Sequence, residues 1–366
     1  MKKNICLITS NLNIFGGAQR VCVNLANEFA RDGYKVMVVS LEYCGKPVYE
    51  LAGNIEYDSV KSNLRARDVF KPSVFWKLRK MFDDFSANII MVIGSASTFG
   101  VLPALGTKAK IVICEHFSYK NKFEQGKKNY INRYIGAKLA DKIVTLTKDN
   151  MEECIKRFHV ATQKVTYIYN FAPDYSDDDL NFEYNSNSKK LITVGRIEPV
   201  KGYDLLVDIA ELVFQSNPEW SWDIYGDVEN EKYFRQVLKK IEEKGLSEKV
   251  HFCGHSKNLH EVFSQYAMYI MTSYHEGLPM VLLEAKAAGL PLVSFDIATG
   301  PNEIIDNDVN GRLIPAYDIV SMAKCINDLI NDVSSRRKLA GGIVEMQKKF
   351  SCTNIMNKWK KLFNEL

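Results

Sequence analysis

Short apolar runs alternate with longer amphipathic segments along most of the chain. The runs predict strands at residues 4–10, 35–41, 87–93, 110–115, 142–147 and 164–169, and at 190–195, 221–226, 249–253, 267–272, 291–296 and 311–315. Between the first two strands, Val21, Leu25 and Phe29 form the apolar stripe of a helix. Strands that alternate with helices are typical of parallel sheets covered on both faces, so the pattern predicts an α/β protein in which this architecture occurs twice.

The alternation stops between residues 172 and 190, a stretch rich in Asp, Asn and Ser. Such a stretch without periodicity is typical of a linker. A chain of 366 residues also exceeds what one core usually holds. We therefore predict an N-terminal domain over residues 1–171 and a C-terminal domain over residues 191–350. A last helix over residues 351–366 carries Trp359 and Phe363, which we expect to pack back on the first domain.

The cysteines and the chain's start limit the compartment. Eight cysteines are scattered without the paired spacing of a metal knuckle or a redox dithiol. The apolar run at the N-terminus ends at Thr9, which is too short for a signal-peptide core, and no stretch is long enough to span a bilayer. These features predict a cytoplasmic protein.

Charge divides the chain into unlike halves. Residues 1–171 hold 26 Lys or Arg against 15 Asp or Glu, a net charge of +11, whereas residues 172–366 hold 22 against 29, a net charge of −7. The basic half should therefore face an anionic partner.

Two basic stretches concentrate this charge. Both mix cations with aromatic and apolar residues and fit helices lying on an anionic membrane surface. Outer helices of a sheet domain with solvated charges are the alternative, and nucleic acid is disfavoured because no recognition motif accompanies the charge. The stretches are residues 71–85, with Lys77, Arg79 and Lys80, and residues 119–138, with Lys120, Lys122, Lys127, Lys128, Arg133 and Lys138 beside Tyr130 and Tyr134.

The segment 266–296 predicts a strand, a tight loop, a helix over residues 279–288 and another strand. Pro279 suits a first helical position, and Gly289 suits the residue past the helix end. The amides of Gly277, Leu278, Met280 and Val281 should then form an anion site at the helix N-terminus. Two carboxylates flank that site. Glu276 precedes the helix, and Glu284 lies within it among apolar residues, unless it shares a solvated face with Lys286.

Two cations flank the first loop of the second domain. The strand at 190–195 runs into Gly195-Arg196, and Lys201-Gly202 lies at the start of the next helix. A planar Arg fork and a mobile Lys charge beside glycines suit a diphosphate, whereas surface salt bridges are the alternative.

The first domain offers a glycine pair and a histidine. Gly16 and Gly17 open a helix after the first strand, where a backbone can approach a ligand closely. The pair is not a dinucleotide fingerprint, although Glu42 imitates the acid that would grip a ribose. His116 follows the strand at 110–115 and is a site candidate, with a structural hydrogen-bonding role as the alternative.

Together these motifs resemble family 4 glycosyltransferases over almost the whole chain. The resemblance rests on Gly16-Gly17-Ala-Gln-Arg, Glu115-His116, Gly195-Arg196 with Lys201-Gly202, Glu276 through Glu284, and Gly300-Pro-Asn-Glu-Ile-Ile305. It implies the GT-B fold, with two Rossmann-like, doubly wound domains facing across a cleft. The later part of the chain is similar to bacterial enzymes that build capsule, O-antigen or other surface polysaccharides.

The resemblance also implies roles for individual residues. Arg196 and Lys201 would hold the donor diphosphate as it leaves, and Glu284 would bind the ribose. Glu276 would contact the transferred sugar, with the amides from Gly277 and Leu278 binding phosphate or sugar. The remaining roles are those of His116 at the donor sugar, Gly16 and Gly17 at the diphosphate, and Gly254 and His255 near the base.

The implied activity is retaining transfer of a sugar, with neither metal nor cofactor. We expect a UDP-hexose or UDP-N-acetylhexosamine donor and a saccharide acceptor linked to a lipid diphosphate at the inner membrane face. No Asp-x-Asp pair follows a strand as a Mg²⁺ site would require, since Asp177, Asp178 and Asp179 lie in the linker. The alternatives are a GDP-sugar donor, a nicotinamide-dependent oxidoreductase and a non-catalytic GT-B scaffold.

Overall fold

The computed structural model describes residues 2–14, 16–42, 45–61, 71–94, 97–119, 127–172, 184–256, 258–342 and 344–366. Lys120 and Lys122 of the second basic stretch lie outside these ranges, as do the side chains of Lys127 and Lys128. The acidic run Asp177–Asp179 lies outside them too.

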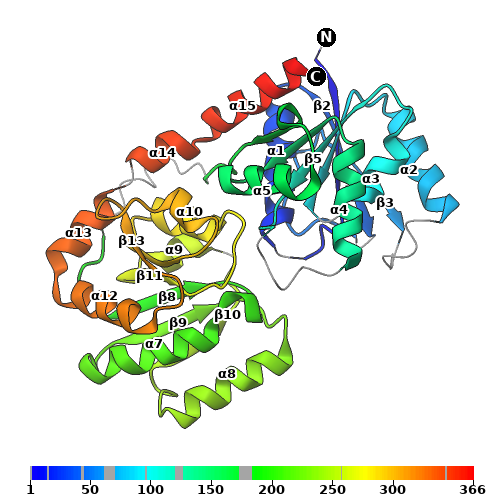
Figure 1. The fold of residues 1–366 in the computed structure, drawn as a ribbon. Coiled ribbons are helices and arrows are strands. Elements are labelled where there is room, and N and C mark those ends of the chain that lie inside the picture. Colours follow the sequence, from blue (N-terminus) through cyan, green and yellow to red (C-terminus); the bar gives the residue numbers. More distant parts are fainter. Residues whose placement is uncertain are drawn as a thin grey trace. The chain divides into compact units, whose positions relative to one another are not determined.

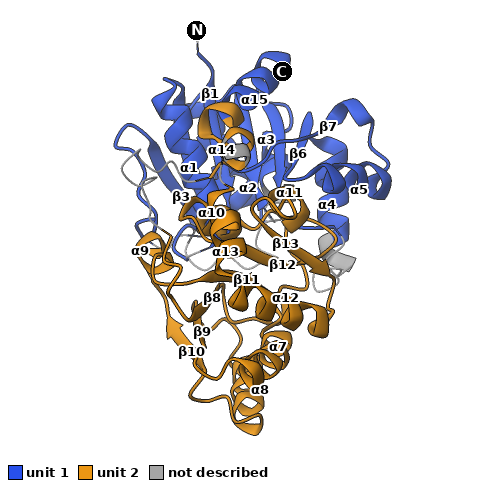
Figure 2. Cartoon of the chain, turned by 90° about the vertical axis from the view of Figure 1, so that its left-hand side faces the viewer, with its two compact units in different colours: residues 1–170, 356–366 blue, residues 171–355 orange. Residues whose placement is uncertain are grey.

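The chain forms two compact units (Figure 2). Unit 1 holds residues 1–170 and 356–366, and unit 2 holds residues 171–355. Each unit is built on one parallel sheet with helices packed against it, so the α/β fold class that we predicted is confirmed.

Unit 1 contains a seven-stranded sheet in the order β3-β2-β1-β4-β5-β6-β7 (Figure 1). We predicted six of these strands and missed β3. That strand lies at the sheet edge, pairs with β2 alone and reads Glu-Tyr-Asp-Ser-Val-Lys, so it has no apolar run. The strands are β1 Asn4–Thr9, β2 Lys35–Glu42, β3 Glu56–Lys61, β4 Ile89–Ile93, β5 Lys110–Glu115, β6 Lys142–Thr145 and β7 Val165–Tyr167.

The helices of unit 1 bury the apolar stripes that the sequence predicts. Val21, Leu25 and Phe29 of α1 are buried, as are Val74 and Leu78 of α2. The described helices are α1 Gly17–Arg31, α2 Pro72–Asp84, α3 Ser97–Ala104, α4 Lys127–Leu139 and α5 Lys148–Phe158, joined by α15 Cys352–Glu365 from the end of the chain.

Helix α15 crosses from unit 2 into unit 1 and packs on α1. The ring centroids of Trp359 and Phe363 lie 6.1 and 5.2 Å from that of Phe29, and all three side chains are buried. The last helix therefore completes the core of the first domain, as its aromatic residues predicted.

Unit 2 contains a six-stranded sheet in the order β10-β9-β8-β11-β12-β13, and every one of these strands lies where we predicted one. Residues 184–190 of the predicted linker pack on this unit, because the Tyr184 hydroxyl donates to Ala267 O at 2.7 Å. The strands are β8 Lys190–Val194, β9 Ser221–Tyr225, β10 Val250–Gly254, β11 Met268–Met271, β12 Leu292–Asp296 and β13 Gly311–Pro315.

The helices of unit 2 include α10, which the sequence placed over residues 279–288. It spans Met280–Ala287 instead, and Pro279 has extended backbone geometry as the residue before the helix. The others are α7 Tyr203–Ser216, α8 Glu231–Glu243, α9 Leu259–Phe263, α11 Pro301–Ile304, α12 Ile319–Asn331, α13 Val333–Gly341 and α14 Val344–Phe350. No helix among the described residues is long and apolar enough to cross a membrane.

Strand order sets where a ligand can bind. In unit 2 the chain leaves β8 toward β9 on one side and later returns to β11 on the other. In unit 1 the same reversal occurs between β1 and β4. A crevice opens outside the carboxyl ends of strands at such a switch point, and ligands bind there in open α/β sheets.

Candidate active site

The candidate site of unit 2 is built from the loops that follow β8 and β11. These strands are neighbours, with Met268 opposite Leu191. The loop after β8 carries Arg196 and Lys201, and the loop after β11 carries Glu276. Both loops therefore leave the sheet at its switch point, which explains why residues 75 positions apart meet.

Hydrogen bonds join the two loops. The Tyr274 amide donates to Val200 O at 2.8 Å, and the Thr272 hydroxyl donates to Lys201 O at 3.2 Å. Lys201 itself ends a short 3₁₀ turn, Pro199–Lys201, before α7. The hydrogen bond from Thr272, the residue after β11, thus fixes the backbone of Lys201, while other contacts orient its side chain.

Glycines permit this close approach. Gly202 has φ 66°, and a Cβ there would lie 2.2 Å from Thr272 O. At Gly195, a Cβ would lie 3.2 Å from the Tyr203 hydroxyl and 3.4 Å, an ordinary contact distance, from side-chain carbons of Lys201. Gly202 therefore has a clear steric reason, since it seats the backbone against the end of β11.

Lys201 and Glu276 form an ion pair at the centre of the site. Lys201 Nζ lies 2.8 Å from Glu276 Oε1, and both side chains are largely shielded from solvent. The Ser273 hydroxyl donates to the same oxygen at 2.7 Å, and the Thr299 hydroxyl donates to the Glu276 carbonyl at 2.6 Å. The sequence assigned these two residues to different parts of a donor, and the structure brings them into direct contact.

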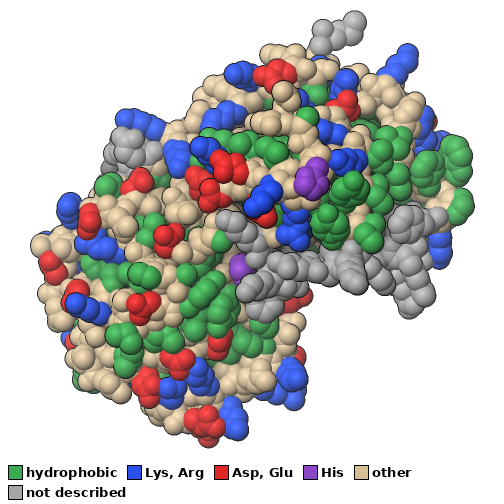
Figure 3. All heavy atoms as spheres, viewed as in Figure 1, with side chains coloured by type: hydrophobic (Ala, Val, Ile, Leu, Met, Phe, Trp, Pro, Cys, Tyr) green, Lys and Arg blue, Asp and Glu red, His purple; other side chains and the backbone are tan. Residues whose placement is uncertain are grey.

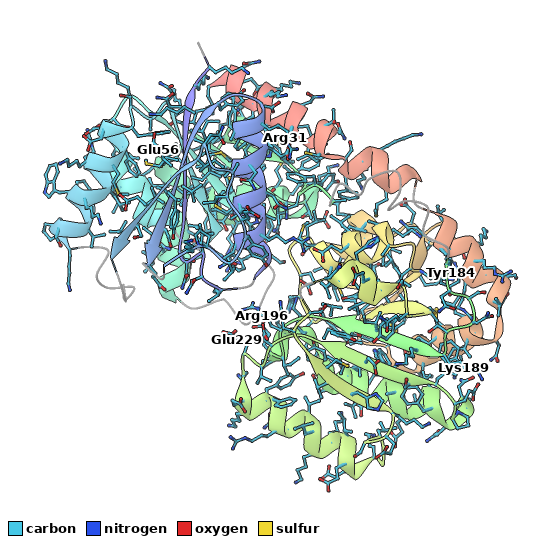
Figure 4. All side chains as sticks on the ribbon, turned by 180° about the vertical axis from the view of Figure 1, so that it is seen from behind. Arg31, Glu56, Tyr184, Lys189, Arg196 and Glu229 are labelled. Atoms are coloured by element: carbon cyan, nitrogen blue, oxygen red, sulfur yellow. The ribbon has the colours of Figure 1, made fainter. Side chains whose placement is uncertain are left out.

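Arg196 lies at the open side of the β8 loop. One guanidinium nitrogen is 2.8 Å from Glu198 Oε1, and the other is 3.8 Å from Glu229 Oε2. Figure 4 shows Arg196 and Glu229 next to each other. The Arg196 side chain is 45% exposed, so an incoming anion can reach the guanidinium without unfolding the loop.

Glu284 lies on the buried side of α10. Only 5% of it is exposed, and Lys286 two residues later is fully buried. The alternative of a solvated face shared by these residues is therefore wrong. Lys286 Nζ donates to the carbonyls of Leu339 and Ala340 at the end of α13, and burial lowers the pKa of this lysine to about 7.

The amides of Met280 and Val281 open α10. The first hydrogen bond of its opening turn runs from the Leu282 amide to Pro279 O, so Met280 and Val281 precede it. Gly277 is partly exposed just before this turn, whereas Leu278 is buried. The N-terminal end of α10 can therefore offer donors to an anion.

Sequence reasoning missed Ser273 and Thr299 as partners of Glu276. Thr299 comes from the loop before α11, which Gly300 holds against the Glu276 loop. Gly300 has φ 103°, and a Cβ there would lie 2.9 Å from Gly277 O. The sequence marked the neighbouring motif at Gly300 but not Thr299, because the contact that places Thr299 is visible only in the structure.

The end of β10 adds the residues predicted near a base. Gly254 has φ 71°, and its carbonyl accepts a hydrogen bond from the Gly226 amide at 2.8 Å. His255 Nδ1 lies 3.4 Å from Asp227 Oδ2. These residues lie at the same carboxyl edge of the sheet as Arg196, and β10 is two strands away from β8, which leads to Arg196 and Lys201.

Unit 1 carries the other candidates. Gly16 precedes α1, and a Cβ at Gly17 would meet no atom within 4 Å. Packing among the described residues does not require glycine at position 17, the first residue of α1. Asn11 donates to Glu42 at 3.1 Å, so the acid that imitates a ribose ligand already has a protein partner.

His116 follows β5 and is partly exposed. Surrounding protein lowers its pKa to about 4, so the imidazole is neutral near pH 7. Glu115, directly before it, is buried 3.6 Å from Arg133 of α4. A neutral imidazole can donate one hydrogen bond and accept another, which suits contact with a sugar hydroxyl.

Within the described ranges, no group of three or more His, Cys, Asp or Glu is arranged to hold a metal ion. The candidate site of unit 2 instead consists of two cations, two carboxylates and helix amides. This set can bind a polyol and a multiply charged anion side by side.

Two family models match the chain. Glycosyltransferase Family 4 matches residues 15–173, and Glycosyl transferases group 1 matches residues 177–342. The glycine pair, His116 and the whole candidate site of unit 2 lie within these two matches.

Several characterised proteins are similar over their full length. The amylovoran biosynthesis glycosyltransferase AmsD of Erwinia amylovora is 27% identical over 98% of this chain and 99% of its own. A Campylobacter jejuni enzyme named GalNAc-alpha-(1->4)-GalNAc-alpha-(1->3)-diNAcBac-PP-undecaprenol alpha-1,4-N-acetyl-D-galactosaminyltransferase is 23% identical over 99% of this chain and 98% of its own. Among solved structures, Anabaena HepE in complex with UDP and glucose superposes with a TM-score of 0.83 at 18% identity, covering all of both chains.

Proposed function

The chain belongs to the family 4 glycosyltransferases, and from that premise we propose that it moves a hexose or N-acetylhexosamine from UDP to a growing bacterial surface saccharide. The transferase class follows from the family. The donor, the stereochemistry and the acceptor are our proposal, argued from the site.

The Lys201–Glu276 pair carries this proposal. A donor diphosphate brings negative charge that competes with Glu276 for the Lys201 ammonium, 2.8 Å away. Once Lys201 turns to the diphosphate, the Glu276 carboxylate becomes free to accept hydrogen bonds from the sugar hydroxyls. One ion pair thus serves both ends of the bond to be broken, and it keeps each charge neutralised until the donor arrives.

Arg196 and the α10 amides would hold the rest of the diphosphate. As the sugar–phosphate bond breaks, charge grows on the leaving phosphate, and donors already aimed at it lower the barrier. These groups supply the charge that a divalent metal provides in other transferases, so we propose transfer without a metal. Activity should then survive EDTA, and an enzyme silenced by EDTA and restored by Mn²⁺ would contradict the assignment.

We propose that transfer retains the α-configuration, as the family resemblance implies, and the roles of the carboxylates bear on how it does so. Glu276 is paired with Lys201 and Glu284 is buried in α10, so we assign one to the sugar and the other to the ribose. A double displacement needs two carboxylates across one bond. Because these two carboxylates serve different parts of the donor, we propose front-face attack, in which the leaving phosphate accepts the proton of the acceptor hydroxyl.

The donor base and the acceptor are supported by the relatives. HepE was solved with UDP and glucose, and the Campylobacter relative is named for an undecaprenol-diphosphate saccharide. We propose that this chain likewise uses a UDP-sugar and a lipid-diphosphate-linked acceptor at an anionic membrane surface, with His116 touching the donor sugar through its neutral imidazole.

Ligand-induced stabilisation tests the donor directly. A ligand that binds only the folded state raises Tm, so UDP and UDP-sugars should raise Tm more than GDP, GDP-sugars or NAD. A larger Tm shift with GDP-sugars would mean that the donor carries guanosine rather than uridine. A Tm shift with NAD alone would favour an oxidoreductase. Stabilisation by UDP-sugars without turnover of any saccharide acceptor would favour a non-catalytic scaffold.

A further inference from the structure

Helix α4 of unit 1 exposes apolar side chains and shields a charged one from solvent. Its buried side carries Gly136, Ala137 and the guanidinium of Arg133, whereas its isoleucines and its leucine face solvent. The ring centroids of the partly exposed Tyr130 and Tyr134 lie 5.7 and 6.5 Å from that of the buried Phe158. Ile131 is 56% exposed, and the other large residues of this surface, the α4 ridge, are each exposed by more than a third. The α4 ridge consists of Tyr130, Ile131, Tyr134, Ile135 and Leu139.

Helical spacing makes the α4 ridge continuous. Ile131, Ile135 and Leu139 are four residues apart, so they stack along one line of the helix. Tyr130 and Tyr134 form a parallel row beside it, with stacked rings 6.2 Å apart. A helix of a sheet domain normally turns such a row toward the core, and exposing it indicates a surface that another body covers.

Cations frame the α4 ridge. Lys138 Nζ lies 5.4 Å from the Tyr134 ring centroid, and the Arg157 guanidinium carbon lies 5.7 Å from that of Tyr130. Residues 127–164 contain nine Lys or Arg against four Asp or Glu, a net charge of +5. The space-filling view shows hydrophobic side chains gathered over α4 with Lys and Arg side chains around them (Figure 3).

We propose that the α4 ridge lies in the headgroup region of a bilayer containing anionic phospholipid. Isoleucine and leucine would enter the acyl boundary, tyrosines would sit at headgroup level, and the surrounding cations would meet lipid phosphates. A second copy of the chain is a poorer occupant, because Lys138 and Arg157 beside the ridge would meet the same cations of the second copy.

The other basic helix, α2, does not supply this surface. Lys77 donates to Ser59 O and Val60 O at 2.7 and 2.9 Å, and Arg79 donates to Leu105 O at 2.7 Å. Lys138 and Arg157 beside the α4 ridge also donate to backbone carbonyls of unit 1, so the two helices differ in their apolar residues rather than in their cations. Trp76 is 65% exposed, but the apolar stripe of α2 is buried.

The α4 ridge is connected to the candidate site of unit 1. Arg133 projects from the inner side of α4 to Glu115, and its guanidinium lies 5.3 Å from the ring centroid of Phe117. Glu115 and Phe117 flank His116 in the sequence. Resting on the proposed function, this connection links the strand end that carries His116, which would touch the donor sugar, to the helix that makes the membrane contact.

Vesicle binding tests the assignment without any substrate. We compare the wild type with a triple variant, Ile131→Ser, Ile135→Ser and Leu139→Ser, on vesicles of phosphatidylcholine with and without phosphatidylglycerol. The partition coefficient of the triple variant on anionic vesicles should be roughly a hundredfold lower than that of the wild type, because the variant lacks three apolar side chains whose removal from water favours binding. Matched controls are Trp76→Ser on α2 and Val320→Ser on unit 2, both exposed and both expected to bind as the wild type does.

Several outcomes would overturn the proposal. One is a triple variant that binds vesicles as well as the wild type does. Another is a wild type that does not bind anionic vesicles at low salt. Sedimentation velocity tests whether a second copy of the chain covers the ridge instead. A wild type that is dimeric and a triple variant that is monomeric would make the α4 ridge a protein interface. Transfer to a soluble saccharide should be unchanged in the triple variant, so loss of membrane binding and failure of the proposed chemistry are separately visible.

Discussion

At the scale of single residues, the site is a set of charges that compensate one another before a ligand binds. Lys201 neutralises Glu276, and Arg196 lies between Glu198 and Glu229. Removing one partner of a shielded pair leaves the other uncompensated. Substitutions here therefore change both the affinity for a donor and the local charge balance.

Lys201→Ala should lower kcat by roughly a hundredfold, because a donor aimed at developing phosphate charge is worth about 3 kcal/mol in the transition state. Arg196→Ala should have a comparable effect. Initial rates at saturating donor measure it, with circular dichroism to verify the fold. Lys239→Ala, an exposed lysine of α8, is the matched control and should keep wild-type turnover. Near-normal turnover in Lys201→Ala would remove the diphosphate assignment.

The neutral His116 imidazole should make stability depend on pH. Its pKa is lowered to about 4 in the folded protein, below the ordinary value of 6.5. The unfolded chain therefore binds this proton more readily, and the free energy of unfolding should fall as the pH drops from 6.5 toward 4.

His116→Asn should weaken that dependence, which Tm measured from pH 7.5 down to pH 4.5 would reveal. His159→Asn is the control, since His159 is exposed in a left-handed conformation that asparagine tolerates. Parallel Tm curves for the wild type and His116→Asn would show that other groups cause the acid sensitivity.

At the scale of elements, the turn between β8 and α7 decides where Lys201 points. Gly202 combines a left-handed backbone with a contact that leaves no room for a Cβ beside Thr272 O. Gly245, after α8, has nearly the same φ, 67° against 66°, but open space around it. Comparing substitutions at these two glycines therefore distinguishes the cost of backbone strain from the cost of steric contact.

Gly202→Ala should destabilise the protein by clearly more than Gly245→Ala. The control should lose about 1 kcal/mol from the left-handed conformation alone, whereas the Gly202 variant must also move the backbone of the Lys201 turn. Urea unfolding followed by circular dichroism gives both values. Gly202→Ala should also lose transfer activity, and equal stability losses with full activity in both variants would show that the turn accommodates a side chain.

At the scale of the whole molecule, the end of the chain stabilises its beginning. Helix α15 starts in unit 2 and places Trp359 and Phe363 in the core of unit 1, against Phe29 and Tyr34. The fold of the first unit therefore depends on the last residues of the chain.

Trp359→Ala should lower the free energy of unfolding of unit 1 by about 3–5 kcal/mol, as deletion of a buried aromatic ring does. Trp76→Ala removes the same side chain from an exposed position and should cost little. Differential scanning calorimetry would report the change as a transition of unit 1 shifted to lower temperature. Equal shifts in the two variants would show that α15 contributes no more than surface contact.

The sequence by itself determined the strands, because a strand in a covered parallel sheet is apolar on both sides and therefore visible as a run. It also determined the glycine and proline positions around α10 and the motifs that carry the family resemblance. Strand β3 stayed hidden because an edge strand is covered less completely and lacks such a run.

Only the tertiary structure decided which charges meet. The Lys201–Glu276 contact depends on β8 lying next to β11, and strand order is set by how the chain crosses the sheet. The burial of Glu284 and the exposure of the α4 ridge were also decided there. Local periodicity shows that a helix has distinct faces, but the packing of its neighbours determines which face is covered.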